Sequence, residues 1–394
     1  MSFSLTEVRF VDSVEVTDFV ANGSFASLKE NVSYKAQPDF AVLARLVDHN
    51  AGWKGGRVYV DEKAYKFLSK SSLTTGDVVI ANVGANAGTV FQIPDLGTPI
   101  TLGPNAVRVR PKGKDLDKEF LYYYLSSPLG QDKLQSIITG SAQPKFNKTA
   151  LRGLSIRLPS FSYQRQTVVL VKALDDRITL LRETNATLEA IAQALFKSWF
   201  VDFDPVHAKM QGRAPEGMDE DTARLFPDEL EESELGLVPR GWRVGTVDDL
   251  CDVITNGGTP SRSKSEFWAN GSMPWFKTGD FSDGFLLTPA ERITEAALVG
   301  SSVKVLPVDA ILMAIYAAPT VGRLGVLTES ATFNQACTGM VAKKSVGPWF
   351  LFLTLYFGRV WFNSRANGAA QQNISKAIVS SYKVVIPSVA VLAG

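Results

Sequence analysis

Apolar residues recur at alternating steps of three and four along residues 162–200, and this spacing predicts one long helix with a heptad seam. The seam consists of Val171, Leu174, Ile178, Leu181, Leu188, Ala192 and Leu195. Asn185 lies on the same seam, where a single polar residue can fix register and partner. Pro159 before the segment and Asp204-Pro205 after it mark its ends. A helix of this length spans roughly 55–60 Å, which favours a spacer; an ordinary long core helix is the alternative.

Shorter apolar runs flank this helix on both sides. Residues 78–83 (VVIANV) predict a buried strand, 106–111 (AVRVRP) alternate like a half-exposed strand, and 120–138 predict helix. The same order returns after the long helix, at 310–315, 336–343 and 350–357. The chain therefore carries a similar unit on each side of the helix.

An ungapped alignment of two segments supports an internal duplication. Residues 140–160 align with residues 368–388 at an offset of 228, and six of the 21 positions are identical, where chance gives about one. A complete duplication would begin a second long helix near residue 392. Because the sequence stops at Gly394, we expect the second copy to contain its globular unit without its helix.

These patterns predict a mixed α/β (α+β) fold with two similar globular domains separated by a long coiled-coil-type helix. The expected segments are domain 1 at 1–160, the long helix at 161–202, a connector at 203–241, domain 2 at 242–388 and the start of a distal region at 389–394.

Composition sets the class of protein. The 394 residues are 45% hydrophobic and 21% charged, as in a folded protein of two or more domains. No apolar run is long enough to span a membrane, and the N-terminus is charged where a signal peptide is apolar. Cys251 and Cys337 form no disulfide framework, so we expect a cytoplasmic protein. The net charge of +1 neither supports nor excludes nucleic-acid binding.

Motifs for catalysis are missing from the sequence. It contains no phosphate-binding loop, no dinucleotide fingerprint and no Asn/Asp-Pro-Pro-aromatic tetrapeptide of the kind that holds a flipped adenine. His49 and His207 lie in different segments, which argues against a histidine metal site. A nuclease-like set, Asp39 with Asp61-Glu62-Lys63, arises easily by chance. We expect no catalysis by this chain alone, and no metal or cofactor of its own.

Basic and amide side chains gather instead in Gly-rich, turn-like segments of both units. Lys and Arg neutralise phosphates, and Asn, Gln and Arg pair with base edges. The candidate DNA-contact residues are Lys54, Arg57, Gln143, Lys145, Lys148, Arg262, Lys264, Lys277, Gln371, Asn373 and Lys376. Solubilising loop residues are the alternative. Two diverged units on a rigid helix would read two short sequences at a fixed separation, giving a bipartite, asymmetric target.

Residues 185–242 closely resemble the central region of type I restriction–modification specificity (S) subunits. GGTPS at 257–261, ahead of Met273-Pro274-Trp275, and residues 368–388 resemble that family's target recognition domains. The resemblance implies a non-catalytic subunit that binds double-stranded DNA and recruits two methyltransferase (M) subunits and two restriction (R) subunits. It also implies that S-adenosylmethionine, ATP and Mg²⁺ serve only those partners.

By the same resemblance, Phe196, Trp199 and Phe200 are candidate M-subunit contacts, with burial in the connector's own core as the alternative. The family's distal helix, which packs on the central one, is absent, so the seam lacks its partner within the chain. Two chains could pair, a separate fragment could supply the helix, or the protein is a truncated, inactive subunit. The rival functions are a coiled-coil protein adaptor and, against the missing motifs, a stand-alone nuclease or methyltransferase.

Overall fold

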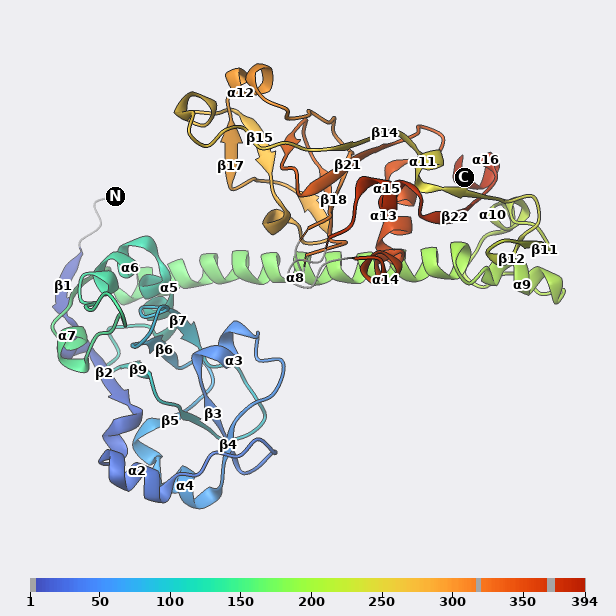
Figure 1. Ribbon diagram of the computed structural model, residues 1–394. Helices are drawn as coiled ribbons and strands as arrows, with labels where there is room; N and C mark the ends of the chain where they lie inside the picture. The colour runs from blue at the N-terminus through green and yellow to red at the C-terminus, as the bar shows by residue number, and fades with distance from the viewer. Residues whose placement is uncertain (1–4, 317–319, 367–372, 394) are drawn as a thin grey trace. The chain divides into compact units, whose positions relative to one another are not determined.

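The computed structural model describes residues 5–316, 320–366 and 373–393, and the chain divides into two compact units, Met1–Glu183 and Thr184–Gly394. The long helix is α8 (Phe161–Phe200), 40 residues in length, which begins in the first unit and ends in the second (Figure 1). The structure confirms the predicted long helix and the mixture of helices and strands.

The first unit contains two four-stranded sheets. One is antiparallel throughout, in the order β2 (Val14–Asp18), β9 (Ala106–Pro111), β6 (Val78–Ala81) and β7 (Val90–Gln92). The other has the order β4 (Tyr59–Val60), β3 (Ala41–Ala44), β8 (Ile100–Leu102) and β5 (Ser72–Leu73), with β3 and β8 parallel. Its helices are α1 (Phe10–Ser13), α2 (Phe25–Asn31), α3 (Leu46–Asn50), α4 (Glu62–Phe67), α5 (Lys118–Ser126) and α6 (Pro128–Gln135), with 3-10 turns η1 (Phe19–Asn22) and η2 (Ser69–Ser71).

The second unit repeats this strand order. Its larger sheet runs β14 (Cys251–Asn256), β21 (Cys337–Ala342), β18 (Ile311–Ala314), β19 (Leu324–Leu327) and an added β16 (Gly284–Leu286). Its smaller sheet runs β17 (Glu291–Ile293), β15 (Met273–Phe276) and β20 (Thr332–Phe333), with β15 and β20 parallel as β3 and β8 are. Its helices are α11 (Val247–Leu250), α12 (Glu295–Gly300), α13 (Pro348–Phe357), α14 (Arg359–Ser364) and α16 (Val389–Ala393), with turns η3 (Ser265–Phe267) and η4 (Thr278–Asp280).

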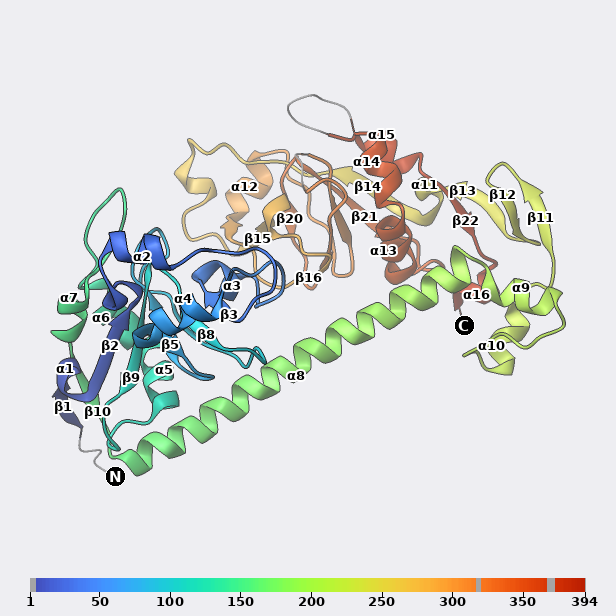
Figure 2. The same ribbon diagram turned by 90° about the horizontal axis from the view of Figure 1, so that it is seen from below.

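The duplicated segments end in the same pair of elements. These are α7 (Lys148–Arg152) and β10 (Ser155–Leu158) in the first unit, and α15 (Lys376–Ser380) and β22 (Lys383–Ile386) in the second. Both pairs keep the offset of 228 found in the sequence. The strand β1 (Thr6–Arg9) pairs with β10, and β13 (Arg243–Thr246) pairs with β22 (Figure 2). Both domains therefore open with equivalent strands of different sequence, TEVR in β1 and RVGT in β13.

The prediction of a half-exposed strand at 106–111 is wrong for Arg108, whereas Arg110 is half-buried. Arg108 is only 3% exposed: one guanidinium nitrogen donates to the Ser72 carbonyl at 2.6 Å, and another pairs with Glu15 at 2.8 Å. Arg110 donates to Asp77, which is 1% exposed. Both arginines also donate to the Ser72 carbonyl of β5, so the alternation in the sequence marks charges that are paired within the unit.

The connector packs on the end of α8 within the second unit. It contains α9 (Asp204–Met210), α10 (Glu220–Leu225) and a hairpin of β11 (Leu230–Ser233) and β12 (Gly236–Pro239). Val206, Phe226 and Trp242 form a buried cluster, against which Trp199 and Phe200 pack. Among the described helices, none combines the length and the apolar character required to cross a bilayer.

Candidate nucleic-acid interface

Polar residues gather at one end of two equivalent sheets, the β2-β9-β6-β7 sheet of the first unit and the β14-β21-β18-β19-β16 sheet of the second. In the first unit β2 and β6 both run antiparallel to β9, so their last residues lie beside the first residues of β9. This end carries Asp18, Asn82 and Asn105. The corresponding end in the second unit carries Asn256 and Gln335. We call these two places the sheet ends.

The duplicated segment supplies each sheet end with a further residue. Lys145 forms a β-bridge to Val83, next to Asn82, and exchanges two backbone hydrogen bonds of 2.9 Å with Thr139. The next residue, Phe146, is 5% exposed and donates its N–H to the Asn82 carbonyl at 3.1 Å. The backbone therefore holds Lys145 firmly while its side chain is exposed.

Lys148 does not offer a free charge at this end. Its ammonium pairs with the Asp18 carboxylate at 2.7 Å, and Asp18 also accepts the Ala21 N–H at 2.9 Å. Lys148 thus ties α7 to the end of β2, a structural role that competes with the predicted phosphate contact. Gln143, by contrast, is exposed.

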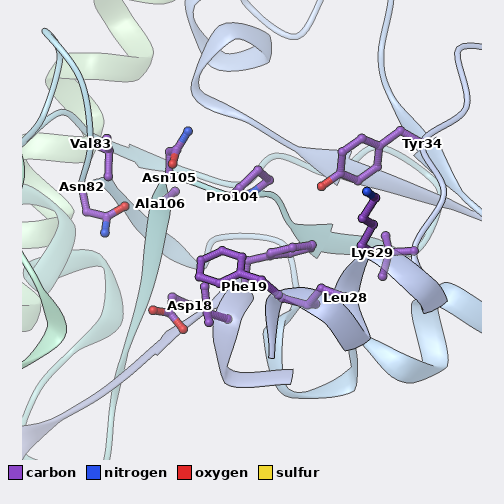
Figure 3. A pocket seen from close by; sticks show the side chains of 13 residues that line it. Asp18, Phe19, Leu28, Lys29, Tyr34, Asn82, Val83, Pro104, Asn105 and Ala106 are labelled. Carbon is purple, nitrogen blue, oxygen red and sulfur yellow. The ribbon is translucent and has the colours of Figure 1, made fainter. Parts of the chain in front are cut away.

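A cavity of about 500 Å³ opens beside the first sheet end (Figure 3). Its walls are mainly apolar and aromatic, and they include Phe19 and Tyr34. Asn82 and Asn105 supply amide groups to the lining. The side-chain amide nitrogen of Asn82 donates to the Phe146 carbonyl at 3.4 Å. The side-chain amide oxygen of Asn82 is buried and has no hydrogen-bond partner in the described part of the chain. Aromatic walls with a few amides suit a flat, polar-edged group such as a nucleobase.

The second sheet end is filled by its own contacts. The Asn256 oxygen accepts from the Thr338 hydroxyl at 2.8 Å, and the Thr259 hydroxyl donates to the Gln335 side chain. The Trp275 indole donates to the Gly258 carbonyl at 3.0 Å. The loop that follows β14, which contains the GGTPS motif, therefore closes over this end and positions the residues after it.

That loop presents Arg262 on an aromatic support. The Arg262 guanidinium lies 3.7 Å from the centroid of the Trp268 ring and pairs with Glu291. Lys277 pairs with the same carboxylate at 2.8 Å. Hydrogen bonds from Arg262 and then Lys277 lower the pKa of Glu291 to about 2, so this carboxylate is ionised at neutral pH and holds two cations side by side.

The first unit has an equivalent of Lys277 that sequence reasoning missed. Lys277 follows β15 and its backbone N–H donates to Asp280 at 2.9 Å; Arg45 follows β3 and donates to Asp48 in the same way at 2.9 Å. The sequence pattern that could have identified Arg45 is the same in both units: a basic residue follows an apolar run and stands three positions before an aspartate. Arg45 is therefore a further candidate, although its guanidinium also pairs with Asp48 at 2.7 Å.

The remaining predicted residues are dispersed. Lys54 and Arg57 lie on a separate loop between α3 and β4, where Arg57 donates to the Trp53 carbonyl at 2.9 Å. Lys264 lies over the Phe267 ring, and Lys376 begins α15 with its side chain exposed. Asn373 is exposed on a bridge described below, and Gln371 lies outside the described residues.

The seam of α8 is exposed along most of its length. Leu174 and Leu188 are each 57% exposed, Ile178, Leu181 and Leu195 are between 41% and 47% exposed, Asn185 is exposed and Val171 is half-buried. Such a continuous apolar stripe is typical of a surface that packs on another helix.

Phe196 is not part of that exposed surface. It is 7% exposed and packs on Phe350 and Phe357 of α13, with ring centroids 5.5 and 5.7 Å away. Trp199 and Phe200 are half-buried in the connector cluster. The prediction of a partner contact is therefore corrected for Phe196: the last turn of α8 is apolar because it forms the core of the second unit.

Carboxylates of the nuclease-like set have structural partners. Asp39 pairs with Lys35 at 2.6 Å, and Asp61 caps α4 by accepting the Ala64 N–H at 2.8 Å. Glu62 pairs with Lys66 on the same helix. Within the described residues, no group of three or more His, Cys, Asp or Glu is arranged to hold a metal ion.

Comparison with known proteins gives a consistent family. A family model described as "Type I restriction modification DNA specificity domain" matches residues 14–190 and 239–390. The specificity subunit of the type I restriction enzyme HindI from Haemophilus influenzae is 26% identical over 366 residues, covering 81% of this chain and 78% of the relative. The MjaIX specificity subunit of Methanocaldococcus jannaschii is 24% identical over 243 residues, covering 62% of this chain and 51% of the relative.

A solved structure shares the fold. The S subunit of a type I restriction–modification system from M. genitalium superposes with a TM-score of 0.53 at 13% identity, covering 99% of this chain and 87% of that chain. At this identity the likeness concerns the arrangement of the backbone.

Proposed function

Because the chain belongs to the type I restriction–modification DNA specificity family, we propose that its two units read the two halves of one bipartite DNA target with their sheet ends. The role of the chain is DNA sequence recognition in a type I restriction–modification system. The resemblance to this family that the sequence indicated is thereby confirmed. The proposal concerns which surfaces read the DNA and what the target looks like.

The observation that carries the proposal is the duplication of one scaffold with different side chains. Both units have the same strand order and the same anchored segment, yet they present Lys145 with an open cavity in one case and Asn373 with Arg262 and Lys277 in the other. Different side chains presented by equivalent scaffolds recognise different base pairs. The expected target is therefore asymmetric, with an unread spacer.

Phosphate contacts would orient each unit on the duplex. The basic residues near the second sheet end are concentrated around Glu291, which holds Arg262 and Lys277 together. Cations fixed in this way neutralise phosphates without carrying sequence information. We assign Arg262, Lys264 and Lys277 to this positioning role, together with Lys376, Lys54 and Arg57.

Methylation and cleavage are assigned to partners. Subunits of this family work with modification and restriction subunits and DNA, and we propose two of each for this chain. The exposed seam of α8 is the proposed partner surface, occupied by a helix of a second chain or of the modification subunit. The cofactors S-adenosylmethionine, ATP and Mg²⁺ would then bind only to those subunits.

The proposal is tested by single-molecule sequencing of adenine methylation in cells that express the chain with its modification subunit. A bipartite asymmetric motif that disappears when the chain is deleted supports the proposal. A symmetric motif would instead indicate paired chains that each use one domain. Absence of any motif would contradict the proposal and favour an inactive subunit.

The exposed seam would also suit a coiled-coil adaptor that binds protein, a function that membership in a DNA specificity family argues against. The two functions differ in how the affinity for duplex DNA responds to salt. Phosphate contacts release counterions, so the affinity of a DNA-reading chain falls steeply as salt rises. No measurable duplex binding by the chain assembled with its modification subunit would favour the adaptor.

A further inference from the structure

We propose that Lys145 and Asn373 occupy one duplicated reading position, and that each selects one base of its half of the target: guanine for Lys145 and adenine for Asn373. This inference rests on the proposed function, in which the sheet ends face DNA. It goes further because it names the residue and the base in each unit.

The backbone places the two residues equivalently. Lys145 bridges to Val83, the second residue after β6, and Asn373 bridges to Tyr316, the second residue after β18. β6 and β18 have the same place in the two sheet orders. The offset between Lys145 and Asn373 is 228 residues, the offset of the whole duplicated segment.

The following residue anchors each position in the same way. Phe146 is 5% exposed and donates its N–H to the Asn82 carbonyl at 3.1 Å, while Ile374 is 1% exposed and donates to the Ile315 carbonyl at 2.9 Å. A buried apolar residue directly after an exposed polar one turns the polar side chain away from the core. The reading position is therefore held rigidly and faces outward in both units.

The positions next to Lys145 in the first unit have structural roles. Asn147 caps α7 by accepting the Ala150 N–H at 2.8 Å, and its equivalent Ser375 caps α15. Lys148 is paired with Asp18. Among the described residues from 144 to 148, Lys145 is the polar residue whose side chain neither caps a helix nor forms an ion pair.

The two side chains differ in the base edge that they complement. A lysine ammonium donates to the O6 and N7 acceptors of guanine, whereas an asparagine amide accepts from N6 and donates to N7 of adenine. A contact of this kind discriminates against a wrong base by roughly 5- to 150-fold. One base in each half-site should therefore depend on one residue.

The experiment exchanges the two residues and sequences the methylated motif. Lys145→Asn and Asn373→Lys are each expressed, as the full chain with its modification subunit, and then combined. Lys145→Asn should replace one guanine by adenine in one half-site only, and Asn373→Lys should replace one adenine by guanine in the other half only. Lys114→Asn and Ser345→Lys are the matched controls, because they make the same change in charge beyond the opposite ends of β9 and β21, and both should leave the motif intact.

The outcomes separate this inference from the proposed function. A bipartite motif with the parent chain that stays unchanged in both exchanges overturns the inference and leaves the proposed function standing. Changes in both half-sites from one exchange also overturn it. A parent chain without any bipartite motif contradicts the proposed function itself. If an exchange abolishes methylation, base selection from a randomised pool of duplexes by the purified complex replaces the cellular readout, and an unaltered preference there counts against the inference.

Discussion

Replacing Glu291 by glutamine should strengthen DNA binding and make it more sensitive to salt. Glu291 is ionised at neutral pH because its pKa lies at about 2, and it neutralises one of the two charges supplied by Arg262 and Lys277. Glutamine keeps an oxygen that accepts hydrogen bonds but removes the negative charge. The stacking of Arg262 on Trp268 does not depend on Glu291, so the guanidinium keeps its support.

The size of the effect follows from counterion release. One further phosphate neutralised makes the slope of log K against log salt about 0.9 steeper. Between 50 and 200 mM salt, the affinity of the Glu291→Gln variant should then fall roughly 3.5-fold more than that of the parent. Arg262 and Lys277 are about half exposed, so loss of the pairs should cost the unit only about 1 kcal/mol of stability each at most.

The assay is fluorescence anisotropy of a labelled duplex carrying the methylated motif, titrated with the assembled complex over this salt range. Glu229→Gln is the matched control, because Glu229 also pairs with an exposed arginine, Arg240, but lies in the connector, which carries none of the proposed phosphate contacts. Equal slopes for the parent and both variants would refute the assignment of Arg262 and Lys277 to phosphate contacts.

Three further outcomes are expected. Leu181→Asp should prevent assembly along the α8 seam in sedimentation experiments with the modification subunit, whereas Ala190→Asp on the opposite helix face should not; unchanged sedimentation of the first variant would show that the seam is no interface. Asp77→Ala should lower the unfolding free energy of the first unit by roughly 3 kcal/mol at pH 7, because it leaves the Arg110 charge unpaired. Burial, the largest single influence, raises the pKa of Asp77, but the hydrogen bonds from Arg110 and the Thr74 backbone, together with the charges of Arg110 and Lys118, outweigh it and leave the pKa below 3.8. The stability deficit of the variant relative to the parent should therefore shrink as pH falls below about 4, which chemical denaturation followed against pH would reveal. Lys148→Ala should leave the salt dependence of DNA binding unchanged, because its charge is already paired; a shallower slope in the same anisotropy assay would restore its role as a phosphate contact.

Sequence periodicity predicted the elements that depend on local pattern. The seam of α8 and the apolar runs of β6 and β18 are patterns within short windows, and each of these elements is found in the structure. The offset of 228 residues came from the alignment of the duplicated segments, and it holds for the bridges formed by Lys145 and Asn373. Periodicity carries this information because side chains return to the same face about every 3.6 residues in a helix and every second residue in a strand.

Contacts between distant segments could not be read in the same way. Lys148 and Asp18 lie 130 residues apart, and Arg262 and Glu291 lie 29 residues apart. A lysine in a turn has the same local sequence whether it meets water, a carboxylate or a phosphate, so its charge alone could not assign its role. The prediction for Phe196 was wrong for the same reason. An apolar helix end has the same local sequence whether it packs on its own domain or on a partner.

The two units also show why one scaffold can serve two different readings. Arg108 pairs in register with Val79, and the position equivalent to it in the second unit is Gly339, which pairs with Leu312. The buried arginine of one unit is replaced by a glycine whose space is filled by neighbouring apolar side chains, among them Leu306. Interiors this different still give the same strand order, because the backbone ladder rather than any one core contact sets the topology. Substitutions at the outward-facing sheet ends disturb the ladder even less, so the residues that contact DNA can diverge while the fold that presents them stays constant.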